Sequence, residues 1–193
     1  MKCPVCKTSV LIDHPLDAAL ASYACTQCGG QWVAATAYFR WLEAQAPKLA
    51  ASAPVMRVDL PVVEHTKAKL CPQCGRILTR ARVGHGVSFS LSHCGGCSGI
   101  WFDANEWEVL RGLNLHTNLH LVFSSAWQAE VAKQEREAQH DDLLRQKLGD
   151  ADFAEIKRIK AWLDAHPKRA ELYAVLLASV PTPPPAPHPP PSH

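Results

Sequence analysis

The sequence lacks any apolar run of the roughly 18 residues that a membrane-spanning helix needs. Its first residues, from Met1 to Pro4, lead into a cysteine pair, whereas a secretory signal would continue into an apolar segment. No nucleophile motif, phosphate-binding loop or paired-carboxylate site occurs in it. These absences predict a cytoplasmic protein that contacts no membrane and has no catalytic activity.

Cysteine is plentiful, with eight residues in two short clusters. In a reducing compartment, cysteines at short spacing favour metal ligation over disulfides. A segment of roughly 30 to 50 residues also buries too small a core to fold without a metal, a disulfide or a partner. The clusters are therefore predicted to be structural metal sites.

The cysteines form four Cys-x-x-Cys pairs arranged as a tandem repeat. Eighteen residues separate the two pairs of copy one, and nineteen separate those of copy two. The repeat continues beyond the cysteines, because the segment 28–33 (CGGQWV) aligns with 97–102 (CSGIWF). The matching order within each copy favours local pairing and predicts two sites, one of Cys3, Cys6, Cys25 and Cys28 and the other of Cys71, Cys74, Cys94 and Cys97.

Each site suits zinc, because two residues between cysteines let one turn present both thiolates to one tetrahedral ion. Pro4 and Pro72 preset φ for the turns, and Gly29 and Gly75 permit the left-handed conformation that directs backbone N–H groups at the sulfurs. We expect two Zn²⁺ ions as cofactors. Iron in a rubredoxin-like site uses similar knuckles and is the alternative, although the short gaps favour a zinc ribbon.

Metal binding changes the charge of the protein. The formal net charge of +2 assumes neutral thiols. Eight thiolates add eight negative charges and two Zn²⁺ ions add four positive ones, which takes the net charge to about −2. Bulk electrostatics therefore do not favour nucleic acid.

The predicted fold is a small metal-bound α+β protein with two tandem zinc ribbons, in which each pair of β-hairpin knuckles is followed by a helix. Asp103 and Glu106 are expected to form a capping box for the second of these helices, and the first is expected to end before Pro47. The C-terminal region is predicted to be helical, with a break at Gly149, and the tail, in which eight of the eleven residues 181–191 are proline, is predicted to be disordered. The predicted division is ribbon 1 with its helix (1–46), a linker with one possible edge strand (47–68), ribbon 2 with its helix (69–112), a long helix (113–149), a helical hairpin (150–180) and the tail (181–193).

The pattern Cys-Pro-x-Cys followed by Cys-x-x-Cys-x-Gly-x-Trp-[Phe/Leu]-Asp-x-x-Glu resembles the bacterial TFIIB-type zinc-ribbon domain family. Copy two carries the whole pattern, including Gly99, Trp101, Asp103 and Glu106. Copy one keeps Gly30 and Trp32 but has Ala34 and Ala37 at the acidic positions. The resemblance covers about residues 1 to 46 and 69 to 112. It implies zinc binding and a ribbon fold, and it implies little about activity.

Two aromatic residues and one basic segment are further candidates for a functional role. Trp32 and Trp101 could stack on bases, but core packing is the favoured interpretation in so small a module. No acidic residue lies between His65 and Phe102, which predicts a basic hairpin in ribbon 2 that could hold nucleic acid. The same charges could instead offset an anionic Zn(Cys)₄ cluster. The basic residues are Lys67, Lys69, Arg76, Arg80 and Arg82.

The favoured function is a zinc-binding, non-enzymatic adaptor whose ribbons present protein-interaction surfaces. A protein partner is expected at the C-terminal helices, where Phe153, Ile156, Ile159 and Trp162 recur at helical spacing. The alternative is a transcription-related protein that binds nucleic acid through the basic hairpin. Redox or metal sensing by the thiolates is a third hypothesis.

Overall fold

The computed structural model describes residues 1–49 and 60–178. These residues fall into two units, which divide between Glu135 and Arg136. The predicted Pro-rich tail and most of the predicted edge strand lie outside the described residues. Within them, no helix has the length and apolar character needed to cross a membrane.

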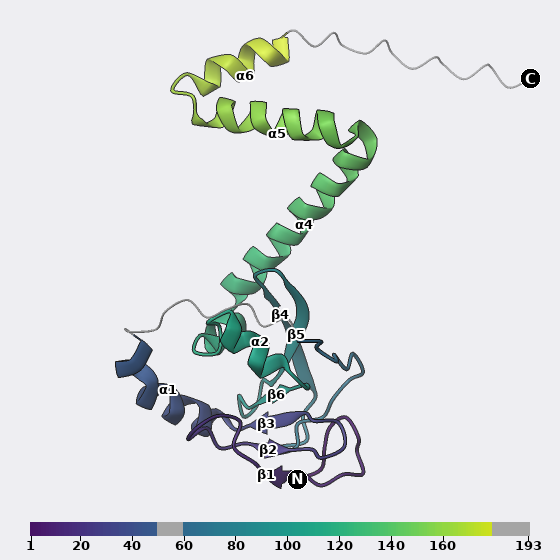
Figure 1. The fold of residues 1–193 in the computed structure, drawn as a ribbon, viewed down its shortest axis with the longest axis vertical. Coiled ribbons are helices and arrows are strands. Elements are labelled where there is room, and N and C mark those ends of the chain that lie inside the picture. Colours follow the sequence, from purple (N-terminus) through teal and green to yellow (C-terminus); the bar gives the residue numbers. More distant parts are fainter. Residues whose placement is uncertain (50–59, 179–193) are drawn as a thin grey trace, which may run out of the picture. The chain divides into compact units, whose positions relative to one another are not determined.

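The first unit is built on one six-stranded antiparallel sheet to which both ribbons contribute. Copy one supplies β1 (Ile12–Asp13), β2 (Tyr23–Ala24) and β3 (Gln31–Val33), and copy two supplies β4 (Leu78–Gly84), β5 (Val87–Cys94) and β6 (Ile100–Phe102). Figure 1 shows β1, β2, β3 and β6 side by side. The strand order is β1-β2-β3-β6-β5-β4, so the two copies join through their equivalent last strands.

The joint between the copies has approximate two-fold symmetry. In the β3–β6 pair, Trp32 lies opposite Trp101, and these two residues occupy equivalent positions of the repeat. Each tryptophan packs over a glycine of the other copy: a Cβ atom on Gly30 would lie 2.2 Å from Cζ2 of Trp101, and one on Gly99 would lie 2.2 Å from Cζ2 of Trp32. Both indoles are fully buried, which confirms the predicted core role.

The helices of the first unit build one core shared by the two copies. They are α1 (Ala35–Leu49), α2 (Glu106–Gly112), α3 (Leu119–Val122) and the start of α4 (Ser125–Leu148). Tyr38 and Trp41 of α1 pack with Trp107 of α2, and the rings of Trp41 and Trp107 lie 5.5 Å apart. The Tyr38 hydroxyl donates to the carbonyl of His116. Burial raises the pKa of Tyr38 to about 12. His116 is half-buried, and its ring lies 5.8 Å from that of Trp107.

Two expectations about helix ends are wrong. Helix α1 continues through Pro47 to Leu49, because a proline near a helix end removes only one of its hydrogen bonds. In the predicted capping box, Glu106 does accept a hydrogen bond from the backbone N–H of Asp103, at 2.9 Å. The Asp103 carboxylate, however, accepts from Trp101 and Lys69 and caps no helix, because buried donors compete for it.

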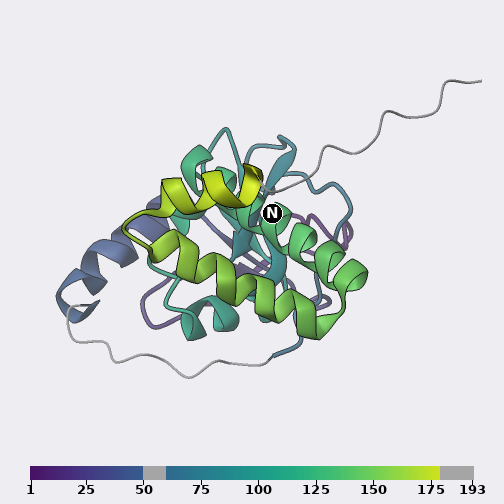
Figure 2. The same ribbon diagram turned by 90° about the horizontal axis from the view of Figure 1, so that it is seen from above.

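The second unit is helical. Gly149 separates α4 from α5 (Asp150–Ala165), as predicted, and a short turn leads to α6 (Arg169–Ala178). Figure 1 and Figure 2 both show α6 turning back along α5, and the two helices are in contact. Phe153 packs inside this unit, with the guanidinium of Arg145 4.8 Å from its ring centre.

Candidate metal centres

Eight cysteines converge on two sites that have the predicted composition. Cys3, Cys6, Cys25 and Cys28 form the first cluster, and Cys71, Cys74, Cys94 and Cys97 form the second. Within each cluster, all four sulfurs lie within 4.8 Å of one another. All eight cysteines are free, so no disulfide competes for the sulfurs. The local pairing of cysteines within each copy is confirmed.

The distances between sulfurs suit a tetrahedral zinc ion. In the first site, the Cys3 and Cys28 sulfurs lie 3.7 Å apart and those of Cys6 and Cys25 lie 3.9 Å apart. The second site is similar, with distances of 3.6 Å and 3.3 Å. Four sulfurs at about 2.3 Å from one ion would be separated by roughly 3.8 Å. The donor set and its spacing therefore fit two zinc ions, one in each ribbon.

Backbone N–H groups support the sulfurs. Those of Cys6 and Cys74 donate to the first sulfur of their own knuckle, at 3.3 Å and 3.4 Å. Gly29 and Gly75 have φ of 71° and 74°, as predicted for the residue after a knuckle. Lys7 adopts the same left-handed conformation, with φ of 64°, at the position where copy one has no glycine. The knuckle geometry is thus conserved between the copies even where the residue differs.

The electrostatic environment shifts the pKa values of some thiols within one cluster in opposite directions. Burial raises the pKa of Cys71 to about 12 and also raises that of Cys28. Burial acts in the same direction on Cys25 and Cys94, but backbone N–H groups outweigh it and lower their pKa values to about 7 and about 6. Because zinc binds thiolates, metal binding must displace the protons that thiols of raised pKa, such as Cys28 and Cys71, retain at neutral pH.

Next to the second metal site lies a buried ion pair that the sequence does not reveal. The Lys69 ammonium and the Asp103 carboxylate are 3.0 Å apart, and both side chains are at least 95% buried. Lys69 also donates to the carbonyl of His65 and to the hydroxyl of Ser92. Asp103 accepts from the indole N–H of Trp101 at 2.8 Å. This lysine is therefore a structural residue, withdrawn from any nucleic-acid surface.

Copy one has no equivalent of this ion pair. Ala34 occupies the position of Asp103, and the buried indole N–H of Trp32 has no hydrogen-bond partner among the described residues. The two acidic residues of the family pattern, Asp103 and Glu106, thus form buried hydrogen bonds that stabilise copy two.

The arginines of the predicted basic hairpin have acidic neighbours in space. Arg80 forms an ion pair with Glu64, and Arg82 forms one with Glu135 of α4. Arg76 lies against Gly96 in a knuckle of the second site, where its charge offsets that of the thiolates. Lys67 is exposed. Sequence reasoning missed Glu64 and Glu135 because both lie outside the acid-free segment.

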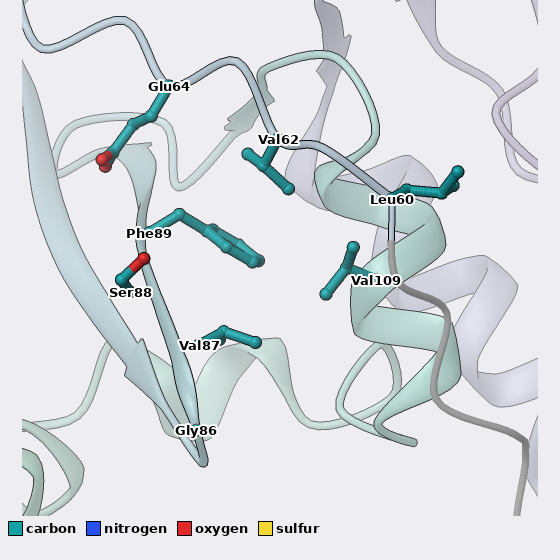
Figure 3. A pocket seen from close by; sticks show the side chains of 8 residues that line it. All are labelled: Leu60, Val62, Glu64, Gly86, Val87, Ser88, Phe89 and Val109. Carbon is teal, nitrogen blue, oxygen red and sulfur yellow. The ribbon is translucent and has the colours of Figure 1, made fainter.

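The surface of the first unit has several hollows, and two of them bear on the function. One, of about 360 Å³, lies between the segment 60–64, β5 and α2, and Figure 3 shows Val62, Phe89 and Val109 around it. Its carboxylate, from Glu64, is already engaged by Arg80 and by the backbone N–H of Ser90. We assign no ligand to this hollow.

The larger hollow, of about 540 Å³, lies between the first knuckles of the two ribbons and is called the knuckle groove below. Equivalent positions of the two copies line it, including the pairs Cys3 with Cys71 and Pro4 with Pro72. The groove therefore exists only because the two ribbons are joined.

Comparison with known proteins finds a similarity that covers both ribbons. Residues 2–44 and 70–110 match the zinc-ribbon family described as transcription factor zinc-finger. The two matched segments contain all eight cysteines. The match does not extend to the C-terminal helices. No curated protein and no solved structure matches the chain.

Proposed function

Because the chain carries two TFIIB-type zinc-ribbon domains, we propose that it is a zinc-binding, non-enzymatic adaptor whose joined ribbons bind a protein partner. Catalytic zinc needs an open coordination position at which water can be activated. Four thiolates fill the coordination sphere in each ribbon and leave no such position. The metal then serves to hold the surface that binds the partner.

The observation that carries the proposal is the knuckle groove and the apolar surface beside it. Leu70 lines the groove and is 57% exposed. Ile77, its partner in a β-bridge, is 65% exposed, and Val10, which bridges to the groove residue Lys2, is 63% exposed. Exposed apolar side chains gathered at a concave site are typical of protein-binding surfaces.

The lining of the groove indicates the kind of segment that it would bind. Lys2 and Lys7 line it together with Cys3 and Cys71, whose metal clusters would each carry about two negative charges, so the lysines balance the thiolates. An extended segment with aliphatic side chains would complement the exposed apolar wall. We therefore propose an aliphatic peptide segment of the partner as the occupant.

Affinity capture of the full chain from its own cells, with and without nuclease, tests this function. Leu70→Glu should lose the partner while retaining two zinc ions per chain. Leu121→Glu, which changes an exposed leucine of α3, is the matched control and should retain it. A partner that survives Leu70→Glu, or that is released by nuclease, contradicts the proposal.

Nucleic-acid binding through the β4–β5 hairpin is the alternative function. It is supported by the absence of acidic residues from His65 to Phe102 and opposed by the ion pairs of Arg80 and Arg82. If it holds, DNA or RNA should bind at low salt and dissociate steeply as salt rises. Changing Arg76, Arg80 and Arg82 to Ala should then abolish binding. The adaptor proposal predicts no binding to either nucleic acid even at low salt.

A further inference from the structure

The C-terminal helical hairpin buries very little apolar surface for a folded unit. Among the described residues from Arg136 to Ala178, only Phe153 and Leu163 are buried. Helical segments of this size usually need a larger core, a metal or a partner to remain folded. No metal-ligand cluster lies among these described residues. A partner surface is therefore the remaining source of stability.

Apolar side chains on both helices are available for such a partner. Ile156, Ile159 and Trp162 recur every third residue of α5, and each is between 41% and 56% exposed. In α6, Leu176 and Leu177 are 52% and 71% exposed. No charged residue follows Glu171 in α6 up to its end at Ala178. A helix that is apolar on all sides is typically a buried one.

The distribution of charge along α5 indicates which partner fits. The acidic residues Asp150, Asp152 and Glu155 lie in its first half, and the basic residues Lys157, Arg158 and Lys160 lie at its middle and in its second half. Asp164 interrupts the basic half, and its carboxylate accepts a hydrogen bond from the hydroxyl of Tyr173 on α6. A second copy of α5 running antiparallel can place Glu155 of each helix opposite Lys160 of the other.

We propose that the α5–α6 hairpin is a homodimerisation element, in which two copies pack antiparallel as a four-helix bundle. With the two-fold axis between Lys157 and Arg158, Ile156 lies opposite Ile159 of the second copy, and Glu155 lies opposite Lys160. The existing ion pairs of Glu155 with Arg158 and of Lys157 with Asp141 join exposed groups, apart from the partly exposed Asp141. Such pairs contribute little to stability and do not oppose a rearrangement.

The size of the hairpin also suits a dimer. At about 1.5 Å per residue, α5 is about 24 Å long and α6 about 15 Å, so two helices of roughly 10 Å diameter present a face with a projected area of about 400 Å². The accessible surface of such a face is of the same order as the roughly 800 Å² per partner in a typical specific interface. An isologous contact uses this face twice and needs no other protein.

The zinc-loaded full chain should have a mass twice the 21.2 kDa of one chain in sedimentation equilibrium. Ile159→Glu should give a monomer that keeps its two zinc ions, and its helix content by circular dichroism should fall because the hairpin has lost its partner surface. Leu70→Glu, in the knuckle groove, is the matched control and should remain dimeric. Conversely, Ile159→Glu should still capture the partner of the knuckle groove, which separates this inference from the proposed function.

Exchanging the charges of Glu155 and Lys160 tests whether the partner of α5 is a second copy of the chain. Glu155→Lys and Lys160→Glu should each weaken the dimer, because each sets like charges opposite one another. The double variant should restore the dimer, since the exchanged charges again pair between copies. A chain that is monomeric at every concentration, a dimer that survives Ile159→Glu, or a double variant no stronger than the single ones would overturn the proposal.

Discussion

Glu106 is the residue whose state depends most on the fold. One of its carboxylate oxygens accepts a hydrogen bond from the backbone of Asp103, and the other has no partner among the described residues. Burial raises its pKa to about 8, and the neighbouring charge of Asp103 adds to this effect. At neutral pH the folded protein therefore holds Glu106 protonated, whereas the unfolded chain ionises it.

This difference predicts a pH-dependent stability that Glu106→Gln removes. Between the unfolded pKa near 4.5 and the folded pKa near 8, the folded state binds the extra proton, so the wild type loses stability as pH rises. The advantage of Glu106→Gln over the wild type should grow by up to about 1.4 kcal/mol per pH unit between pH 6 and 8. It should then level off above pH 8.

Denaturant unfolding of both proteins across this pH range, with zinc retained, measures the effect. Using the difference between the two proteins cancels the pH dependence of the metal sites, which both share. A difference that does not change with pH would show that Glu106 is ionised in the fold.

At the scale of elements, the pairing of β3 with β6 joins the two ribbons into one sheet. Each ribbon alone would expose the edge of its last strand and the face of its tryptophan. In the joined sheet, Trp32 and Trp101 cover Gly99 and Gly30 reciprocally. The glycine of the Cys-x-Gly-x-Trp pattern is thus explained by the other copy, because only a residue without Cβ leaves room for the facing indole.

Replacing either of these glycines should destabilise both ribbons. Gly30→Ala brings a methyl group against Trp101 and should lower the free energy of unfolding by about 2–3 kcal/mol. Gly99→Ala should have a similar effect through Trp32. Gly95→Ala is the matched control, because its Cβ would meet no atom within 4 Å, and it should change stability by no more than about 0.5 kcal/mol. Equal unfolding midpoints for Gly30→Ala and Gly95→Ala would contradict this packing.

At the scale of the whole molecule, the shared core couples the two metal sites. Zinc binding supplies much of the folding energy of small ribbons, roughly 10 to 16 kcal/mol per site at neutral pH. In this protein the sheet and core join both copies within Met1–Glu135. A loss of metal from one site therefore removes packing from the other.

Removing the first site should weaken the second. In the double variant Cys25→Ser/Cys28→Ser, zinc at the remaining site should bind about tenfold more weakly, a coupling of ordinary size. Competition with a chromophoric chelator measures the affinity, with the wild type as reference. An unchanged affinity at the second site would mean that the ribbons fold independently.

The sequence by itself determined the local chemistry. Four Cys-x-x-Cys pairs at matching spacing predicted two four-cysteine zinc sites, because a short turn can present both of its sulfurs in only a narrow range of ways. The left-handed residues after the knuckles, the buried tryptophans and the helix break at Gly149 were also predictable, since each depends on a few neighbouring residues.

Only the tertiary structure decided what depends on residues far apart in the chain. The pairing of β3 with β6, the withdrawal of Lys69 into an ion pair with Asp103, and the ion pairs that Arg80 and Arg82 form with Glu64 and Glu135 all join residues at least 16 positions apart. Composition and spacing report the charge and periodicity of a segment, but they do not report which other segment packs against it. For this protein, the spacing of the cysteines was therefore enough to predict the metal sites. The protein surface around those sites depends on how the two copies pair, which the spacing does not report.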